Sequence, residues 1–182
     1  MDTKVVAYTT LVLRIIDILS LIASVVLLVL NNSTLSDGTK TSFKDFHAYW
    51  FVLATAVLGA AYSIVQLTFD IYYACTEKRL IRHERLPQFD FYADEIMSLI
   101  LASGVGAGYG MSLEFKRFIN QVFDALEALG DCDLSEARSK GQDFFNKGIF
   151  VTSLLLLGCL CMTMVSVFSS INKREATRGF FK

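Results

Sequence analysis

The chain has 182 residues, of which 53% are apolar, 19% are charged and one is proline, and its formal net charge is −1. This length favours a single domain, and charged residues are fewer than the ~25% of an average soluble domain. The composition predicts an integral membrane protein, and a net charge near zero gives no electrostatic support for nucleic-acid binding.

Four apolar runs follow one another along the chain, and each is long enough for a membrane-spanning helix. A 30 Å hydrocarbon core requires about 20 helical residues, and backbone groups in lipid must be paired within the protein. The sequence therefore predicts an all-α, integral membrane, antiparallel four-helix bundle that forms one domain. Its expected spans are about 8–30, about 47–74, about 93–113 and about 149–171.

Basic residues near the spans predict the orientation of the bundle. The short loop of about 75–92 and the tail of 172–182 are densely basic, whereas the loop of about 31–46 is not, and the loop of about 114–148 mixes basic with acidic residues. We therefore expect the loop of about 75–92 and both termini, including the basic tail, in the cytoplasm. The loops of about 31–46 and about 114–148 are then expected outside the cell.

The last loop also carries apolar residues at helical spacing. One interpretation is that the third helix continues outside the membrane and packs on the other extracellular loop. The other is an interfacial or partner-binding helix. The residues concerned are Phe115, Phe118, Ile119, Val122, Phe123, Leu126 and Leu129, with Gly130 as a helix stop.

Arg14 and Asp17 lie inside the first span, where ionised side chains are costly. Asp94 begins the third span at a similar depth, so an ion pair between Arg14 and Asp94 would satisfy both groups and join the two helices. A local explanation is also open, because Asp17 lies one turn after Arg14 and because an arginine at this depth can extend to the headgroups.

The third span contains the glycine-rich stretch SGVGAGYG. It follows no predicted strand and lacks a P-loop lysine, so it is not a nucleotide-binding loop. Within an apolar helix, its glycines form two small-xxx-small frames, Gly104/Gly108 and Gly106/Gly110, which favour close helix packing. We expect this packing within the protomer, and contact between protomers is the alternative.

Asn31 and Asn32 both match the glycosylation acceptor pattern on the side expected to be outside. Since they directly follow the first span, we expect poor access for the transferase. The sequence contains no Ser-His-Asp, HExxH or phosphate-cradling pattern, so it predicts no catalytic residue, no metal and no cofactor.

Three stretches carry a family resemblance: LRIIDI in the first span, FKDFHAYWFVLATAVLGAAYSIVQL in the second, and FDFYADEIMSLILASGVGAGYG in the third. They resemble the CASP-like proteins, plant relatives of the Casparian strip membrane domain proteins, which are distantly similar to MARVEL four-helix proteins. The most specific marks are Arg14 and Asp94, and Tyr49 and Tyr62 match as well.

The resemblance implies residence in the plasma membrane, cytoplasmic termini and homo- or hetero-oligomers, and the founding members form immobile scaffolds that recruit wall-modifying enzymes. The chain departs from those founders, because its second extracellular loop has only Cys132 where theirs has paired cysteines, and because its first extracellular loop is short and polar. Only the general scaffold role carries over.

We therefore expect a non-enzymatic plasma-membrane scaffold that self-associates laterally and positions partner proteins. Its expected partners are membrane lipid and further copies or related family members, in a homodimer, heterodimer or larger oligomer. The alternative is a small channel or transporter that uses the charge cluster of Arg14 and Asp94, since intramembrane charges often mark pathways.

Overall fold

A computed structural model of the chain describes residues 3–34, 40–76, 86–128 and 135–180. Four long helices dominate it: α1 (Thr3–Val29), α2 (His47–Thr76), α3 (Leu86–Ala128) and α4 (Ser135–Phe180). Two short strands and a 3-10 turn lie between α1 and α2: β1 (Asn32–Thr34), β2 (Lys40–Ser42) and η1 (Phe43–Asp45). The predicted all-α four-helix architecture is confirmed.

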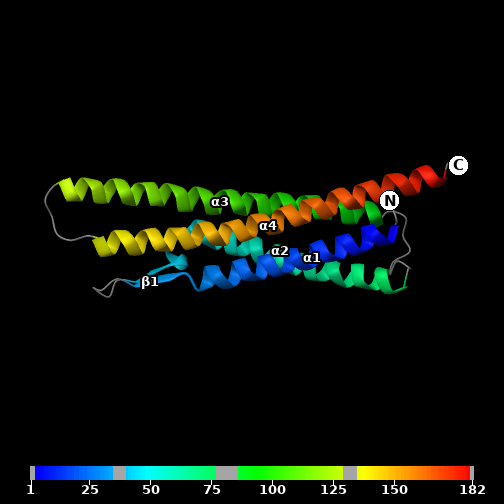
Figure 1. The fold of residues 1–182 in the computed structure, drawn as a ribbon, viewed down its shortest axis with the longest axis horizontal. Helices are drawn as coiled ribbons and strands as arrows, with labels where there is room; N and C mark the ends of the chain where they lie inside the picture. Colours follow the sequence, from blue (N-terminus) through cyan, green and yellow to red (C-terminus); the bar gives the residue numbers. More distant parts are fainter. Residues whose placement is uncertain (1–2, 35–39, 77–85, 129–134, 181–182) are drawn as a thin grey trace.

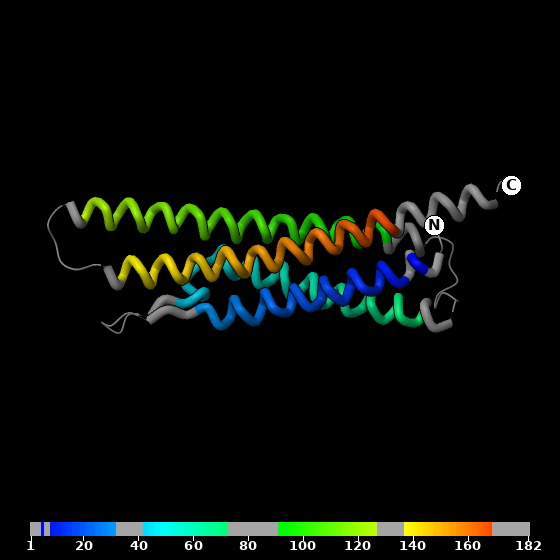
Figure 2. The backbone as a smooth tube through the Cα atoms, in the orientation of Figure 1, coloured from blue at the N-terminus to red at the C-terminus, as the bar shows by residue number. Residues whose placement is uncertain are grey.

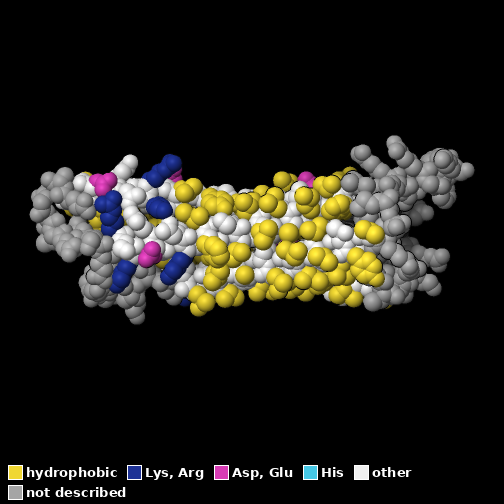
Figure 3. Space-filling view, in the orientation of Figure 1, with side chains coloured by type: hydrophobic (Ala, Val, Ile, Leu, Met, Phe, Trp, Pro, Cys, Tyr) yellow, Lys and Arg dark blue, Asp and Glu magenta, His cyan; other side chains and the backbone are white. Residues whose placement is uncertain are grey.

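Each helix contains a segment that is long and apolar enough to cross a membrane. These segments are Tyr8–Val29, His47–Tyr72, Phe91–Leu126 and Ala137–Phe168. Apolar side chains also form the outside of the bundle, where Figure 3 shows a broad hydrophobic band that is bordered on its left by charged side chains. A helix that is apolar on its outer face as well as its inner face is typical of a membrane span, because lipid replaces water around it.

The helices run antiparallel, and the start of α1 and the end of α4 lie at the same end of the bundle (Figure 1). Around the bundle the order is α1, α2, α3, α4, and α4 packs back against α1. Consequently α1 and α3 lie diagonally across the core and run in the same direction (Figure 2). The core between them is lined by buried side chains that include Leu21, Val52, Leu101 and Leu155.

At the end remote from the termini, α3 and α4 project beyond α1 and α2 (Figure 1). The segment of about 114–148, expected as an extracellular loop, is therefore largely helical. The third helix does continue out of its predicted span, but its main partner there is α4. Arg138 pairs with Asp124 at 2.9 Å across the two helices, and Gln142 donates to Asn120 at 2.7 Å.

An aromatic cluster closes the bundle where this projection begins. Phe46 precedes α2 and packs its ring against Phe115 of α3 and Phe144 of α4, with ring centroids 5.3 and 5.8 Å apart. Tyr49 follows Phe46 by three residues, and the Tyr49 hydroxyl is 2.9 Å from the Ser112 hydroxyl. These contacts join α2, α3 and α4 and cover the end of the core that is remote from the chain termini. The contact between Phe46 and Phe115 also matches the expectation that the continued third helix packs on the loop of about 31–46.

Candidate functional site

Arg14 is the centre of a polar network inside the bundle, near the end that holds the chain termini. Only 3% of the residue is exposed. Its Nη2 donates to both carboxylate oxygens of Asp94, at 3.2 and 3.0 Å, and its Nε donates to Asp70 at 2.5 Å. One guanidinium therefore joins α1 to both α2 and α3.

The depth of these residues explains why they meet. Arg14 lies near the start of the first span and Asp94 near the start of the third, and these two helices run in the same direction. Asp70 lies near the end of the second span, which runs in the opposite direction. All three positions thus reach one level of the bundle. The sequence, together with the resemblance, predicted an ion pair between Arg14 and Asp94, and the structure places the two side chains in direct contact.

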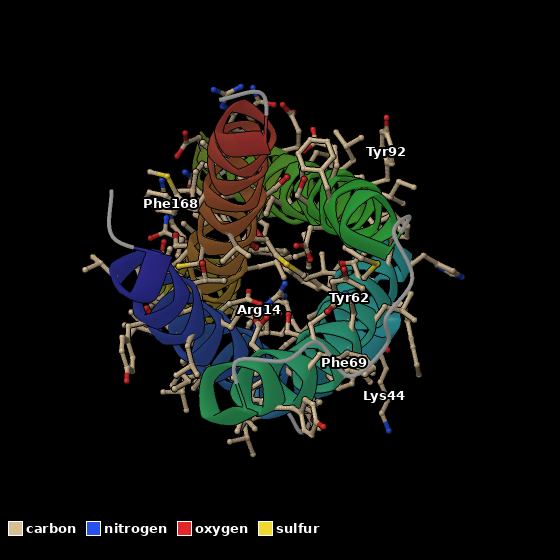
Figure 4. All side chains as sticks on the ribbon, turned by 90° about the vertical axis from the view of Figure 1, so that its right-hand side faces the viewer. Arg14, Lys44, Tyr62, Phe69, Tyr92 and Phe168 are labelled. Carbon is tan, nitrogen blue, oxygen red and sulfur yellow. The ribbon has the colours of Figure 1, made fainter. Side chains whose placement is uncertain are left out.

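Tyr62 and Gln66 extend the network on α2. The Tyr62 hydroxyl donates to Asp94 at 2.7 Å, and Gln66 Nε2 donates to that hydroxyl at 2.9 Å. Figure 4 shows Tyr62 and Arg14 directed into the bundle, whereas Tyr92 points away from it. Sequence reasoning noted Tyr62 only through the resemblance and did not single out Gln66. Their spacing of four residues, which puts two polar side chains on one helix face, was the available signal.

Asp17 does not make the local pair that sequence spacing allowed. Among the described residues, no hydrogen bond and no ion pair within 4.0 Å joins it to Arg14. Its Oδ2 instead accepts a hydrogen bond of 2.5 Å from Ser63 of α2. Its Oδ1 lies beside α4, where a Cβ on Gly158 would be 3.0 Å away. Asp17 thereby contacts two further helices from inside the core.

Burial and hydrogen bonding together define what this network can do. Arg14, Asp17 and Asp94 are each at most 3% exposed; Asp94 accepts from Arg14 and Tyr62, and Asp17 accepts from Ser63. Such groups hold helices in a fixed rotation and register, because separating paired charges in an apolar interior costs much free energy. The arrangement is that of a structural polar network that fixes α1, α2 and α3 relative to one another.

The four glycines of α3 divide into two pairs with different surroundings. A Cβ on Gly104 would be 2.2 Å from Thr55 Oγ1, and one on Gly108 would be 2.5 Å from Thr152 Oγ1. These two glycines therefore permit close packing of α3 on α2 and α4. A Cβ on Gly106 or Gly110 would meet nothing within 4 Å. The expectation of packing within the protomer thus fits the first pair and not the second.

The two acceptor asparagines lie where α1 ends. Asn31 is 1% exposed, and its Nδ2 donates to the Phe144 carbonyl at 3.1 Å. The amide nitrogen that glycosylation would use is therefore engaged inside the protein. The side chain of Asn32 lies outside the described residues. The expected poor access of the transferase stays a prediction, and the burial and hydrogen bond of Asn31 support it.

Four membrane-spanning helices, three of them joined by a buried Arg–Asp network, define a small polytopic membrane protein. Comparison with known proteins shows that the chain belongs to the Casparian strip membrane protein family, because the family's domain matches residues 3–121. The predicted family is thereby confirmed, and the distant link to MARVEL proteins stays a prediction.

Relatives in several plants match along most of their length. The chain is 39% identical to CASP-like protein 4D1 of Ricinus communis over 163 residues, which cover 88% of each protein. It is 38% identical to CASP-like protein 4D1 of Arabidopsis thaliana, over 83% of this chain and 79% of that protein. It is 35% identical to CASP-like protein 4D2 of the same plant, over 88% and 86%. No solved structure matches the chain.

Proposed function

We propose that the protein is a non-enzymatic scaffold of the plasma membrane that self-associates through the lipid-facing side of α3 and positions partner proteins. The observation that carries this proposal is the outward-facing pair Gly106 and Gly110. Both are exposed on α3, and neither would have a Cβ contact within the protomer. The two glycines are therefore not required for helix packing within a single protomer.

The geometry of this face favours a second helix as its partner. Ala102, Gly106 and Gly110 are all exposed and follow one another every four residues, so they form one stripe of minimal side chains along α3. Helices in lipid associate mainly by close packing, and small residues at this spacing let two backbones approach. Two copies could present the same stripe to each other around a two-fold axis, which is the commonest symmetry of homo-oligomers.

The interior of the bundle supports a scaffold over a channel or transporter. The charged groups lie at one level and are engaged with one another, as Arg14 is with Asp70 and Asp94. Beyond that level, the buried Leu21, Leu101 and Leu155 fill the middle of the core. A conducting pathway needs polar groups or water along its full depth. We therefore expect no ion flux above background when the purified protein is reconstituted in liposomes.

Self-association is tested by replacing the outward glycines and comparing them with an inward one. We expect the Gly106→Ile, Gly110→Ile double variant to fold normally, to lose crosslinked dimer in membranes, and to recover faster after photobleaching at the plasma membrane. The matched control is Gly104→Ile, which should instead lower protomer stability, because the site is filled by Thr55 and Leu155. An unchanged dimer yield and unchanged recovery in a well-folded double variant would refute this interface.

A further inference from the structure

A groove lies between the end of α1 and the projecting part of α4, at the membrane boundary remote from the termini. The volume of this open groove is about 660 Å³. We propose that this groove binds one aminophospholipid, a phospholipid whose headgroup ends in a primary ammonium, as in phosphatidylethanolamine. The inference is independent of the proposed scaffold role and of the side of the membrane on which the groove lies.

The floor of the groove is apolar and suits the glycerol and upper acyl region of a lipid. Leu27 and Leu30 contribute from α1 and the residue after it, and Phe150 and Val151 contribute from α4. Leu30 and Phe150 are 68% and 59% exposed, at the level where the first span ends. Exposed apolar side chains at this level lie at the boundary between the hydrocarbon and the headgroups, so a lipid can cover them.

The polar end of the groove contains an acceptor that lacks a donor. Asn31 lines the groove and is 1% exposed. The Phe144 carbonyl can only accept, so it fixes the amide nitrogen of Asn31 toward itself and turns Oδ1 the other way. Among the described residues, Oδ1 has no hydrogen-bond partner. A buried amide oxygen is normally paired, and a donor bound in the groove beside it would satisfy that need.

Charges on the rim match a zwitterionic headgroup. Asp143 and Lys147 lie one turn apart on α4, and within the described part of the chain no ion pair joins them. The groove lies at the C-terminal end of α1, which is the negative end of the helix dipole. The last turn of α1 has no basic residue, so α1 itself does not neutralise this partial charge. In this proposal the ammonium binds Asp143 and the Asn31 oxygen, and the neighbouring phosphate binds Lys147, since all three residues line the groove.

The same groups discriminate between lipids of similar shape. Phosphatidylcholine has the same phosphate and the same net charge, but its quaternary ammonium has no N–H to donate to Asn31 or Asp143. Purely anionic headgroups would satisfy Lys147 and oppose Asp143. The geometry therefore favours a headgroup with a phosphate and a hydrogen-bond donor of positive charge.

The test measures lipid retained by the purified full-length protein. Protein is extracted from bilayers that contain equal amounts of phosphatidylethanolamine and phosphatidylcholine, and native mass spectrometry counts the lipids that remain bound. We expect phosphatidylethanolamine to be retained about tenfold over phosphatidylcholine, and this preference to fall to about twofold in Asp143→Asn. Lys147→Gln should lower the retention of both phospholipids, because both carry the phosphate. Both side chains are exposed, so neither change should unfold the protein.

Matched controls separate the groove from general surface charge. Glu114→Gln and Arg117→Gln remove the same charges from exposed positions on α3, outside the groove, and should keep the full preference. Equal retention of the two phospholipids by the natural protein would overturn the proposal. So would a preference that survives in Asp143→Asn, an unchanged retention of both phospholipids in Lys147→Gln, or the same losses in the two control variants.

Discussion

Arg14 is retained in an apolar helix because two other helices supply its counter-charges. A guanidinium presents several donors in one plane, so it can bind Asp94 through Nη2 and Asp70 through Nε at the same time. In lipid a complete pair of this kind adds little net free energy, since both groups are desolvated. Removing one partner is far more costly, because it leaves a charge uncompensated.

We predict that Arg14→Leu lowers the free energy of unfolding by about 3–5 kcal/mol and reduces surface expression, since it leaves Asp70 and Asp94 close together without a cation. Arg14→Lys should recover only part of this loss, because an ammonium cannot reproduce the planar fork. Unfolding of the purified protein in mixed micelles measures both variants. Arg117→Leu, which removes an exposed arginine on α3, is the control. If Arg14→Leu had the same free energy of unfolding as the natural protein, the network would not contribute to stability.

Exchange of the two charges is expected to rescue less than an isolated pair would. The Arg14→Asp, Asp94→Arg double variant restores one opposite-charge contact, but it places a new carboxylate beside Asp70 and a guanidinium beside Tyr62. Adding Asp70→Asn should therefore improve the rescue. A double-mutant cycle on stability measures the coupling energy. If the two single effects simply add, the contact between Arg14 and Asp94 does not couple the helices.

Asp17 differs from Asp94 because, within the described part of the chain, no cation pairs with it directly. Its Oδ2 accepts from Ser63, and an asparagine oxygen could accept the same hydrogen bond. We therefore predict that Asp17→Asn keeps the free energy of unfolding within about 1 kcal/mol of the natural protein or raises it. Asp94→Asn should lower it by more, because Asp94 is the bidentate partner of Arg14. The same micelle assay compares them, and a greater loss for Asp17→Asn would contradict this assignment.

At the scale of elements, α3 shows how one glycine-rich helix serves two surfaces. Its inward glycines lie against threonines of α2 and α4, and these threonines also bond their own helix backbones, Thr55 to the Val52 carbonyl and Thr152 to the Gly148 carbonyl. Moving either threonine to admit a methyl group would disturb that hydrogen bond as well as the helix contact. The outward glycines have no such neighbours.

Alanine substitutions should separate the two surfaces cleanly. We predict that Gly104→Ala and Gly108→Ala each lower the free energy of unfolding by about 1–3 kcal/mol, because the added Cβ forces packed side chains to move. Gly106→Ala and Gly110→Ala should leave it unchanged or slightly higher, because alanine is the better helix former. Thermal unfolding of the four variants under one detergent condition provides the comparison. An equal loss from all four would mean that the outward pair also packs within the protomer.

At the scale of the whole molecule, four spans place the start of α1 and the end of α4 at one end of the bundle (Figure 1). The buried Arg–Asp network lies toward that end, and the helical projection of α3 and α4 lies at the other. The two ends of the protein thus differ in kind. One is tied together by polar contacts inside the membrane, and the other by an aromatic cluster at its boundary.

We predict that both termini face the cytoplasm, because the short basic loop of about 75–92 and the basic tail are on the same side. A pH-sensitive fluorescent protein fused to either terminus should then keep its signal when the medium around intact cells is acidified. The same fluorophore inserted within 129–134, between α3 and α4, should respond at once. A response from either terminal fusion would show that the orientation is reversed.

The sequence by itself determined the number of spans, the all-α class and the family. Spans can be read locally, because about 20 consecutive apolar residues are needed to cross the hydrocarbon core wherever the other helices lie. It also determined that Arg14 and Asp94 have similar depths, since depth follows from the distance of each residue to the end of its span.

Only the tertiary structure decided which side chains meet at that depth. The rotation of each helix about its axis depends on packing against two neighbours, and no local pattern reports it. That rotation brought Asp70 and Tyr62 into the network and directed Asp17 to Ser63 instead of Arg14. It also turned Gly104 and Gly108 inward while Gly106 and Gly110 faced out, because residues two apart in a helix lie on nearly opposite sides.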